Sequence, residues 1–365
     1  MVSVYLSCVF QVGAGLLFAL WGRRMHHIAE KIDSIRKEWG NRLLILGHHY
    51  QRSSVIRHAD ETGDSLELAR KAGRNRTAEH IVFCGVRFMA ESADILTGPD
   101  QTVYMPEMSA GCPMADMADV ASAEAAWQVL EATGGGCIPV VYVNSSAELK
   151  AFCGRRGGST CTSSNAAGVF RWVLNQGSKV FFLPDEHLGA NTARDLGIAD
   201  DKVLLYERHR ESGGLEPDRI KQGRVIVWKG FCLVHTAFTV EHVRRVREAL
   251  PAARIIVHPE VPKEVVAVAD AHGSTSQIIK YVEDAPDGSM IVIGTELNLV
   301  QRLAEQHRGR VNVKVLAPSV CANMSKTNEQ NLLDLLENWH DERIVRVPEA
   351  VAKDAGMALE RMLEL

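Results

Sequence analysis

The stretch LLILGHHY at residues 43–50 is an apolar segment that ends in polar residues. The chain contains two further segments of this kind, and their repetition is the main indication of the fold. The segments VVYVNS at 140–145 and IIVHPE at 255–260 have the same character. Continuous apolar runs of this length are typical of strands that are buried on both faces of a parallel sheet. We therefore expect one such strand in each of three similar units.

Each of these strands is followed by the same order of features. A turn that carries hydroxyl groups comes next and is expected to open a helix; the three turns are TGDSL at 62–66, TSSN at 162–165 and GSTS at 273–276. A second apolar strand follows at 81–85, 180–184 and 290–294, and each copy closes on one cysteine: Cys112, Cys232 or Cys321.

The spacings between these features support a true repeat. His48 to Ser65 is 17 residues, Asn144 to Ser163 is 19, and His258 to Thr275 is 17. The middle copy has 69 residues between its hydroxyl and its cysteine, against 47 and 46 in the other two. The segment 204–221, rich in charge and glycine, accounts for the difference, and we expect it to be a surface insertion.

The repeats predict an α/β protein made of three αβα units with parallel sheets. We expect these units to span 25–112, 113–232 and 233–321, with the C-terminal helical segment 322–365 packing back on the first. The helical spacing of its apolar side chains predicts a buried stripe of Leu332, Leu335, Leu336 and Trp339. Ligands bind beyond the carboxyl ends of parallel strands, so three such units would surround one shared cavity.

The first residues form a separate extension, 1–24. Met1 to Trp21 carry no charge, and as a helix this run would be about 31 Å long, enough to span a bilayer. Arg23 and Arg24 follow it. Three interpretations stay open: an extension ahead of a true start at Met25, a membrane anchor whose basic pair keeps the rest in the cytoplasm, or a cleaved secretory signal. We expect the body of the protein to be cytoplasmic and without membrane association.

Composition excludes several classes of protein. With 46% hydrophobic and 24% charged residues, the 365-residue chain is neither disordered nor fibrous. Its 41 basic and 45 acidic residues argue against a nucleic-acid partner, which would normally require a basic excess. Eight cysteines, mostly without CxxC pairing, are too few for a disulfide scaffold and exclude a zinc ribbon. The chain has neither a Walker loop nor a GxGxxG turn after a strand, so we do not expect a nucleotide ligand.

Cys112, Cys232 and Cys321 occupy the same place in their repeats, whereas the other five cysteines fit inert buried positions. Three converging thiolates are ligands for a soft metal, and an iron–sulfur cluster is the main interpretation. Four irons held by three thiolates leave one iron open to act as a Lewis acid on substrate. A zinc ion with three cysteines and a water is the competing interpretation.

Ser65, Ser163 and Thr275 stand at the expected helix starts, where free backbone N–H groups favour an anion. Simple N-capping is the alternative role for each of them, but three equivalent turns indicate a site for carboxylates or phosphate.

Six acid–base groups fall at strand ends or beside a repeated cysteine. As a set around one cavity they could transfer protons, although a lone histidine at a strand end is more often structural. They are His48, Tyr50, Tyr142, His235, His258 and Glu260.

Many ordered segments from residue 26 onward resemble the quinolinate synthase family, and the long middle unit resembles its larger branch. The segments that carry this resemblance are GHHYQ (47–51), GDSLELA (63–69), CGVRFMAESADIL (84–96), AGCPMAD (110–116), YVNSSAELKA (142–151), CTSSNA (161–166), LPDEHLGAN (183–191), WKGFCLVH (228–235), VHPE (257–260), GSTSQIIKYV (273–282), IGTE (293–296) and CANM (321–324).

The resemblance implies three α/β domains related by pseudo-threefold symmetry around a central 4Fe–4S cluster, which Cys112, Cys232 and Cys321 would hold. The implied reaction condenses iminoaspartate with dihydroxyacetone phosphate to quinolinate, phosphate and water in NAD biosynthesis, after an aspartate oxidase or dehydrogenase has supplied the iminoaspartate. The implied substrate-binding residues are His48, Ser65, Tyr142, Val143, Asn144, Ser163, His258, Pro259, Glu260 and Thr275. The implied catalytic residues are His48, Tyr50, Tyr142, His235, His258 and Glu260.

Two positions depart from the family's pattern: Val261 stands where many relatives have cysteine, and Arg87 stands where histidine is common. Two other functions also stay open at this point. One is an iron–sulfur redox or oxygen sensor, which would not need the acid–base groups. The other is a hydro-lyase that acts on a hydroxy acid as aconitase does, but the three hydroxyl turns disfavour it.

Overall fold

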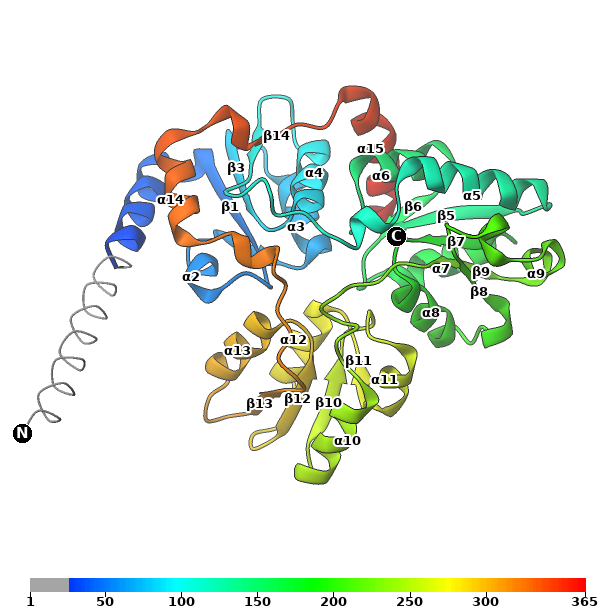
Figure 1. Ribbon diagram of the computed structural model, residues 1–365. Coiled ribbons are helices and arrows are strands. Elements are labelled where there is room, and N and C mark those ends of the chain that lie inside the picture. The colour runs from blue at the N-terminus through cyan, green and yellow to red at the C-terminus, as the bar shows by residue number, and fades with distance from the viewer. Residues whose placement is uncertain (1–25) are drawn as a thin grey trace, which may run out of the picture.

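The computed structural model describes residues 26–365, and the predictions made for residues 1–24 lie outside this range. Figure 1 shows three α/β units arranged around a common centre, each built on its own sheet. The predicted fold class is therefore confirmed. From residue 26 to the C-terminus, membrane-spanning helices are absent, because none is both long and apolar enough to cross a bilayer.

The first unit has a five-stranded sheet in the order β14-β4-β3-β1-β2. A helix over 26–39 and a 3-10 turn, η1 (Gly40–Arg42), lead into it. The elements that follow are β1 (Leu43–His48), α2 (Ser53–Ile56), β2 (Glu61–Gly63), α3 (Ser65–Arg74), β3 (His80–Cys84), α4 (Arg87–Leu96) and β4 (Thr102–Tyr104). Strands β1 to β4 pair in parallel, and every residue of β1 is buried, which explains its unbroken apolar run.

The second unit has a fully parallel sheet in the order β6-β5-β7-β9-β8. Its elements are η2 (Ala115–Met117), α5 (Val120–Ala132), β5 (Cys137–Tyr142), α6 (Ala147–Arg155), β6 (Ser159–Cys161), α7 (Ala166–Asn175), β7 (Lys179–Leu183), α8 (Glu186–Asp195), η3 (Asp200–Lys202), β8 (Val203–Tyr206), η4 (Glu211–Gly214), α9 (Pro217–Gln222) and β9 (Val225–Trp228).

The third unit has a parallel sheet in the order β11-β10-β12-β13. Its elements are α10 (Val240–Ala249), β10 (Arg254–Val257), α11 (Lys263–Val268), β11 (Ala271–His272), α12 (Thr275–Glu283), β12 (Met290–Gly294), α13 (Leu297–Gln306) and β13 (Asn312–Val315). In all three sheets the first strand of the unit lies between the second and the third, and a later strand lies beyond the third. This shared order bears out the repeat seen in the sequence.

The first residues of the middle unit's extra segment extend the sheet, so the expectation of a surface insertion over 204–221 was wrong for 204–206, whereas most of the residues that follow are exposed. Strand β8 forms the sheet edge, with Leu204 and Tyr206 buried. The Tyr206 ring stacks on Trp228 of β9, with ring centroids 5.6 Å apart. The charged and glycine-rich residues belong to the turns that follow this buried strand, which is why composition alone concealed it.

The chain crosses between units three times, and each crossing carries one of the repeated cysteines. Cys112 lies between β4 and α5, Cys232 between β9 and α10, and Cys321 between β13 and η5 (Met324–Lys326). Each cysteine opens a turn in which its carbonyl accepts a hydrogen bond from the backbone N–H four residues later, at distances of 3.0–3.2 Å. The three thiols are therefore presented by the same local geometry.

The C-terminal segment divides between two units, which differs from the expected packing on the first unit alone. Helix α14 (Glu329–Asn338) buries Leu332, Leu335 and Leu336 in the first unit's core, as predicted, while Trp339 caps the end of the helix and packs on this core partly buried. After η6 (Asp341–Arg343), β14 (Ile344–Val345) pairs antiparallel with β4. Helix α15 (Glu349–Glu364) then lies along α6 and β6 of the second unit, and Figure 1 shows it bridging the two units. The limits of the three domains stay a prediction.

The packing of α15 on α6 generates a stability prediction. A Cβ atom at Gly154 of α6 would lie 1.8 Å from the carbonyl oxygen of Asp354 in α15. We expect Gly154→Ala to lower the free energy of unfolding by at least about 2 kcal/mol in urea denaturation, because backbone would have to move. Gly168→Ala in α7 is the matched control, since its Cβ would meet only Leu365 O at 3.9 Å. It should leave stability unchanged or raise it by up to about 1 kcal/mol. Equal stability of the two variants would contradict the close approach of α15.

Candidate active site

Strand register shows which residues of the three units are equivalent. Gly47 pairs with Cys84, Val141 with Leu183, and Val257 with Gly294, in each case at the end of the central strand pair. The triplets that follow are 48–50, 142–144 and 258–260. Tyr142 is thus the counterpart of His48 and His258, while Asn144 is the counterpart of Tyr50 and Glu260. The sequence spacing had aligned Asn144 with the two histidines, which was wrong by two residues.

A cavity of about 260 Å³ lies where the carboxyl ends of the three sheets meet. Thirteen of the predicted site residues line it: His48, Tyr50, Ser65, Cys112, Tyr142, Asn144, Ser163, Cys232, His235, His258, Glu260, Thr275 and Cys321. Val143 and Pro259 are the middle residues of their triplets and are not among the lining residues, because successive side chains of an extended segment point in opposite directions. Their part in substrate binding stays a prediction.

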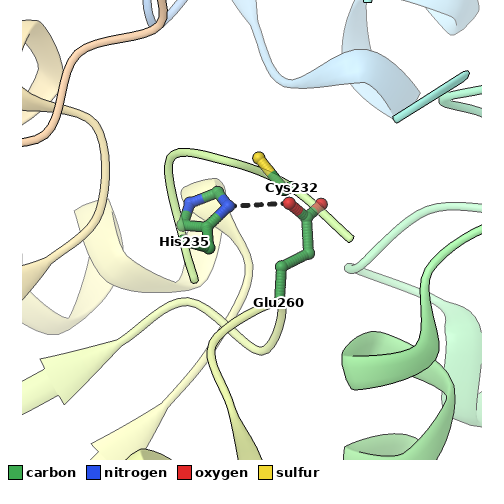
Figure 2. A group of neighbouring side chains, drawn as sticks. All are labelled: Cys232, His235 and Glu260. Carbon is green, nitrogen blue, oxygen red and sulfur yellow. Dashed lines mark hydrogen bonds and ion pairs between the residues drawn. The ribbon is translucent and has the colours of Figure 1, made fainter. Parts of the chain in front are cut away.

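Glu260 is the buried centre of the polar groups in this cavity. Its Oε1 accepts a hydrogen bond from the Tyr142 hydroxyl at 2.5 Å, and its Oε2 lies 2.7 Å from His235 Nδ1 (Figure 2). Burial alone would raise the pKa of Glu260, but the neighbouring His235 and His258 lower it to about 2. Burial and the charge of Glu260 raise the pKa of Tyr142 well above 10, so the carboxylate accepts and the phenol donates.

A chain of hydroxyl groups continues from His235 across the cavity. His235 Nε2 lies 3.1 Å from Thr295 Oγ1, which lies 2.8 Å from Tyr50 Oη, and Thr275 Oγ1 donates to Tyr50 Oη at 3.3 Å. One assignment of the hydrogens satisfies every contact: Thr275 donates to Tyr50, Tyr50 to Thr295, Thr295 to His235, and His235 to Glu260. The arrangement is a continuous path for a proton between Tyr50 and the Glu260 carboxylate.

His48 and His258 share one geometry at equivalent positions. In each, Nδ1 accepts the backbone N–H two residues later, that of Tyr50 at 3.1 Å and that of Glu260 at 3.3 Å. The proton of the neutral ring is therefore on Nε2, which is free to donate to a ligand. Burial, helped by neighbouring cationic groups, lowers the pKa of both histidines to about 3, so they are neutral donors at physiological pH.

The three hydroxyl turns are similar, and the predicted anion-binding residues do not cap the helices themselves. The caps of α3 and α12 are the residues just before them, Asp64 and Ser274, which form capping boxes with Glu67 and Gln277. Thr162 holds the same place in the second unit, where its Oγ1 accepts the N–H of Ser164 and its N–H donates to Asn165 Oδ1, but the N-cap of α7 is Asn165. Ser65, Ser163 and Thr275 are thereby left to face the cavity. In the second unit the regular helix begins only at Ala166.

Asn144 carries a further signal for a ligand. Its Oδ1 atom is buried and has no hydrogen-bond partner among the described residues, although it lines the cavity. An unpaired buried carbonyl costs about 1–3 kcal/mol, which a bound donor would recover. Asn144 is therefore placed to accept a hydrogen bond from a substrate.

The three repeated cysteines line the same cavity and fit a metal or cluster. The seven cysteines that the structure describes all have free thiols. Burial raises the pKa of all three repeated cysteines, that of Cys112 to about 12, while backbone N–H groups of the turn after each cysteine act against this by bonding to the sulfur. N–H groups directed at sulfur favour the thiolate, the form that ligates metal. Cys232, His235 and Glu260 also have their ligand atoms within 4.8 Å of one another, and Figure 2 shows His235 and Glu260 joined, with the Cys232 side chain beside them.

Sequence reasoning missed several polar groups at the site. Thr295 follows the third strand of its unit, so the strand-end rule could have found it. Asp64 lines the cavity and caps α3, and the pattern DxxE at 64–67 is the signal of a capping box. Asp185 caps α8 and has a buried Oδ2 without a partner within the described range.

The chain is similar to known proteins along nearly its whole described length. A family model described as quinolinate synthetase A protein matches residues 30–364. The quinolinate synthase of Geobacillus sp. (strain WCH70) is 48% identical over 347 residues, which cover 93% of this chain and 94% of that protein. The quinolinate synthase of Bacillus subtilis (strain 168) is 46% identical over 341 residues, covering 92% of each chain, and that of Rhodopirellula baltica is 46% identical over 356 residues, covering 92% of this chain and 90% of its own. By the extent of these matches, the chain belongs to the quinolinate synthase family.

Proposed function

We propose that this protein condenses iminoaspartate with dihydroxyacetone phosphate to give quinolinate, phosphate and two waters, in de novo NAD biosynthesis. The observation that carries the proposal is the cavity itself, which holds three free cysteines beside a buried carboxylate and its chain of proton-transferring groups. Both substrates are anionic, and three hydroxyl turns at helix starts line the same space. Iminoaspartate is a reactive imine, so an aspartate oxidase or dehydrogenase must supply it.

Cys112, Cys232 and Cys321 are the residues that would hold a 4Fe–4S cluster. Such a cluster, with one iron free of protein ligands, supplies a Lewis acid for the final dehydration. The free thiols, the matching turns and the N–H groups aimed at sulfur support this assignment.

The chain's own residues account for binding. Ser65, Ser163 and Thr275 bind the carboxylates and phosphate, and the Asn144 amide orients the substrate through its unpaired Oδ1. His48 and His258 donate from Nε2 to carbonyl or hydroxyl oxygens of the substrates. Because these donors are buried, they act in a medium of low dielectric constant, where such bonds are strong.

Proton movement centres on Glu260. Its carboxylate is ionised, and we assign it as the base that takes a proton during phosphate loss and carbon–carbon bond formation. Its low pKa makes it a weak base, so the hydrogen bonds from Tyr142 and His235 must weaken as the proton arrives. The hydrogen bonds run from Tyr50 through Thr295 and His235 toward Glu260, so this chain can pass a proton toward the carboxylate, while the Tyr142 hydroxyl donates to its other oxygen. The proton that Glu260 takes can return to a substrate hydroxyl that leaves as water.

The overall proposal is tested by anaerobic purification, cluster reconstitution and an assay with both substrates. Quinolinate and phosphate should form in equal amounts. A stable cluster with no quinolinate would favour a sensor, and activity on a hydroxy acid alone would favour a hydro-lyase.

Replacing one cluster cysteine tests the metal assignment. Cys232→Ala should remove both the brown cluster absorbance and quinolinate formation, because two thiolates cannot hold the cluster. Cys137→Ala is the control, since this partly buried thiol lies outside the cavity, and it should retain both properties. A colourless but active Cys232→Ala enzyme, or zinc in place of iron in the wild type, would contradict the assignment.

Substitutions of Asn144 test whether the substrates that bind beside it are anionic. Asn144→Ala should raise KM by about tenfold through loss of one substrate hydrogen bond. Asn144→Asp keeps an acceptor at this position but should raise KM further, because its added negative charge repels the carboxylates and phosphate of the substrates. Steady-state kinetics that show Asn144→Asp equal to or better than Asn144→Ala would contradict the proposal that anionic substrates bind beside Asn144.

The Glu260→Gln variant tests whether Glu260 is the catalytic base. The amide keeps the shape of the side chain but cannot take a proton, so kcat should fall by about 10²–10⁴ with KM changed much less. Retained kcat would exclude Glu260 as the base.

A further inference from the structure

Asp64 connects all three units through one carboxylate. Its Oδ1 accepts the backbone N–H groups of Leu66 and Glu67 at the start of α3, each at 3.0 Å. Its Oδ2 accepts the hydroxyl of Ser164 from the second unit at 2.8 Å and that of Ser276 from the third unit at 2.6 Å. Asp64 is buried and lines the cavity.

The two serines follow directly after Ser163 and Thr275, which face the cavity. A hydrogen bond that fixes Ser164 therefore fixes the turn that carries Ser163, and the same holds for Ser276 and Thr275. Ser65 directly follows Asp64 in the chain. Asp64 therefore contacts all three turns that carry the predicted anion-binding hydroxyls, one through the backbone and two through hydrogen bonds.

The three helices begin close together, which is electrostatically unfavourable, and the Asp64 carboxylate offsets this cost. Each helix carries about half a positive charge at its N-terminus, and three helices that begin at one place repel each other. A carboxylate between them is attracted to all three and accepts four hydrogen bonds, the full capacity of its two oxygens. The residues in the same place in the other two units, Thr162 and Ser274, each have a single side-chain oxygen and could not accept this set of bonds.

We propose that Asp64 is a positioning residue for substrate binding, which holds the starts of α7 and α12 against α3 so that Ser65, Ser163 and Thr275 form one anion site. This inference rests on the proposed function, because the anions are those of the proposed substrates. Asp64 acts through Ser164 and Ser276 and has no direct chemical step.

The decisive variant is Ser164→Ala/Ser276→Ala, which removes both inter-unit bonds and leaves the cap of α3 intact. We expect KM to rise by about tenfold for at least one substrate, with kcat changed less than threefold. The dissociation constant of quinolinate, measured by calorimetry on the cluster-loaded protein, should rise by a similar factor. The matched control is Ser92→Ala/Ser159→Ala, which removes two buried hydroxyl hydrogen bonds elsewhere and should lower Tm by as much while KM stays unchanged.

Variants of Asp64 itself separate positioning from stability. Asp64→Ala should raise KM as the serine pair does, and adding the serine changes to Asp64→Ala should have no further effect on KM. Asp64→Asn should keep KM within about threefold of the wild-type value. Its amide oxygen still caps α3, and its amide N–H can donate to the Ser164 and Ser276 hydroxyls once these reorient to accept.

Two results would overturn the proposal: a serine pair indistinguishable from its control in KM and quinolinate affinity, or additive effects in the combined variant. Failure of the proposed function is distinguishable, because the wild-type protein would then make no quinolinate.

Discussion

Parallel strand pairing is the constraint on which the rest of this structure depends. In a parallel sheet every strand ends at the same edge, and in each unit the chain leaves that edge through a crossing that carries one cysteine. Three such crossings connect three sheets in a ring, and α14 returns to the first unit after the third crossing. The cysteines, the strand-end triplets and the helix starts therefore all reach the same central region.

The centre of the molecule is polar and buried, so its stability must come from elsewhere. Glu260, His258 and Asp64 are all at most 6% exposed, and each is compensated by specific hydrogen bonds. Buried charges of this kind seldom add net stability, although breaking one partner is costly. The apolar cores of the three units, which lie on the faces of the sheets, carry the stabilising burial. The site is thus an arrangement that the three packed units hold in place.

Repetition is what made so much of the site predictable from sequence. The three cysteines and the hydroxyls Ser65, Ser163 and Thr275 were found because each recurs at a similar spacing, and the structure brings them to one cavity. Prediction failed where the units differ from one another. Strand β8 was concealed by its charged neighbours, and the connection from β5 to the Ser163 turn, which contains α6, is longer than its counterparts, which misaligned Asn144. The C-terminal segment was expected on the first unit alone, whereas α15 packs mainly on the second, because a helix's periodicity shows that it packs but not on what.

The local features follow from the amino-acid sequence alone: the apolar strands, the capped helix starts, the three cysteine turns and the resemblance of the chain to its family. These depend on interactions between residues close together in the chain, such as the capping box of Asp64 and Glu67. The contacts between units are visible only in the folded protein. Those include the pairing of Glu260 with Tyr142, 118 residues away, and the bonds of Asp64 to Ser164 and Ser276. Residue spacing in the sequence cannot reveal such contacts, because they depend on how the three sheets are oriented toward one another.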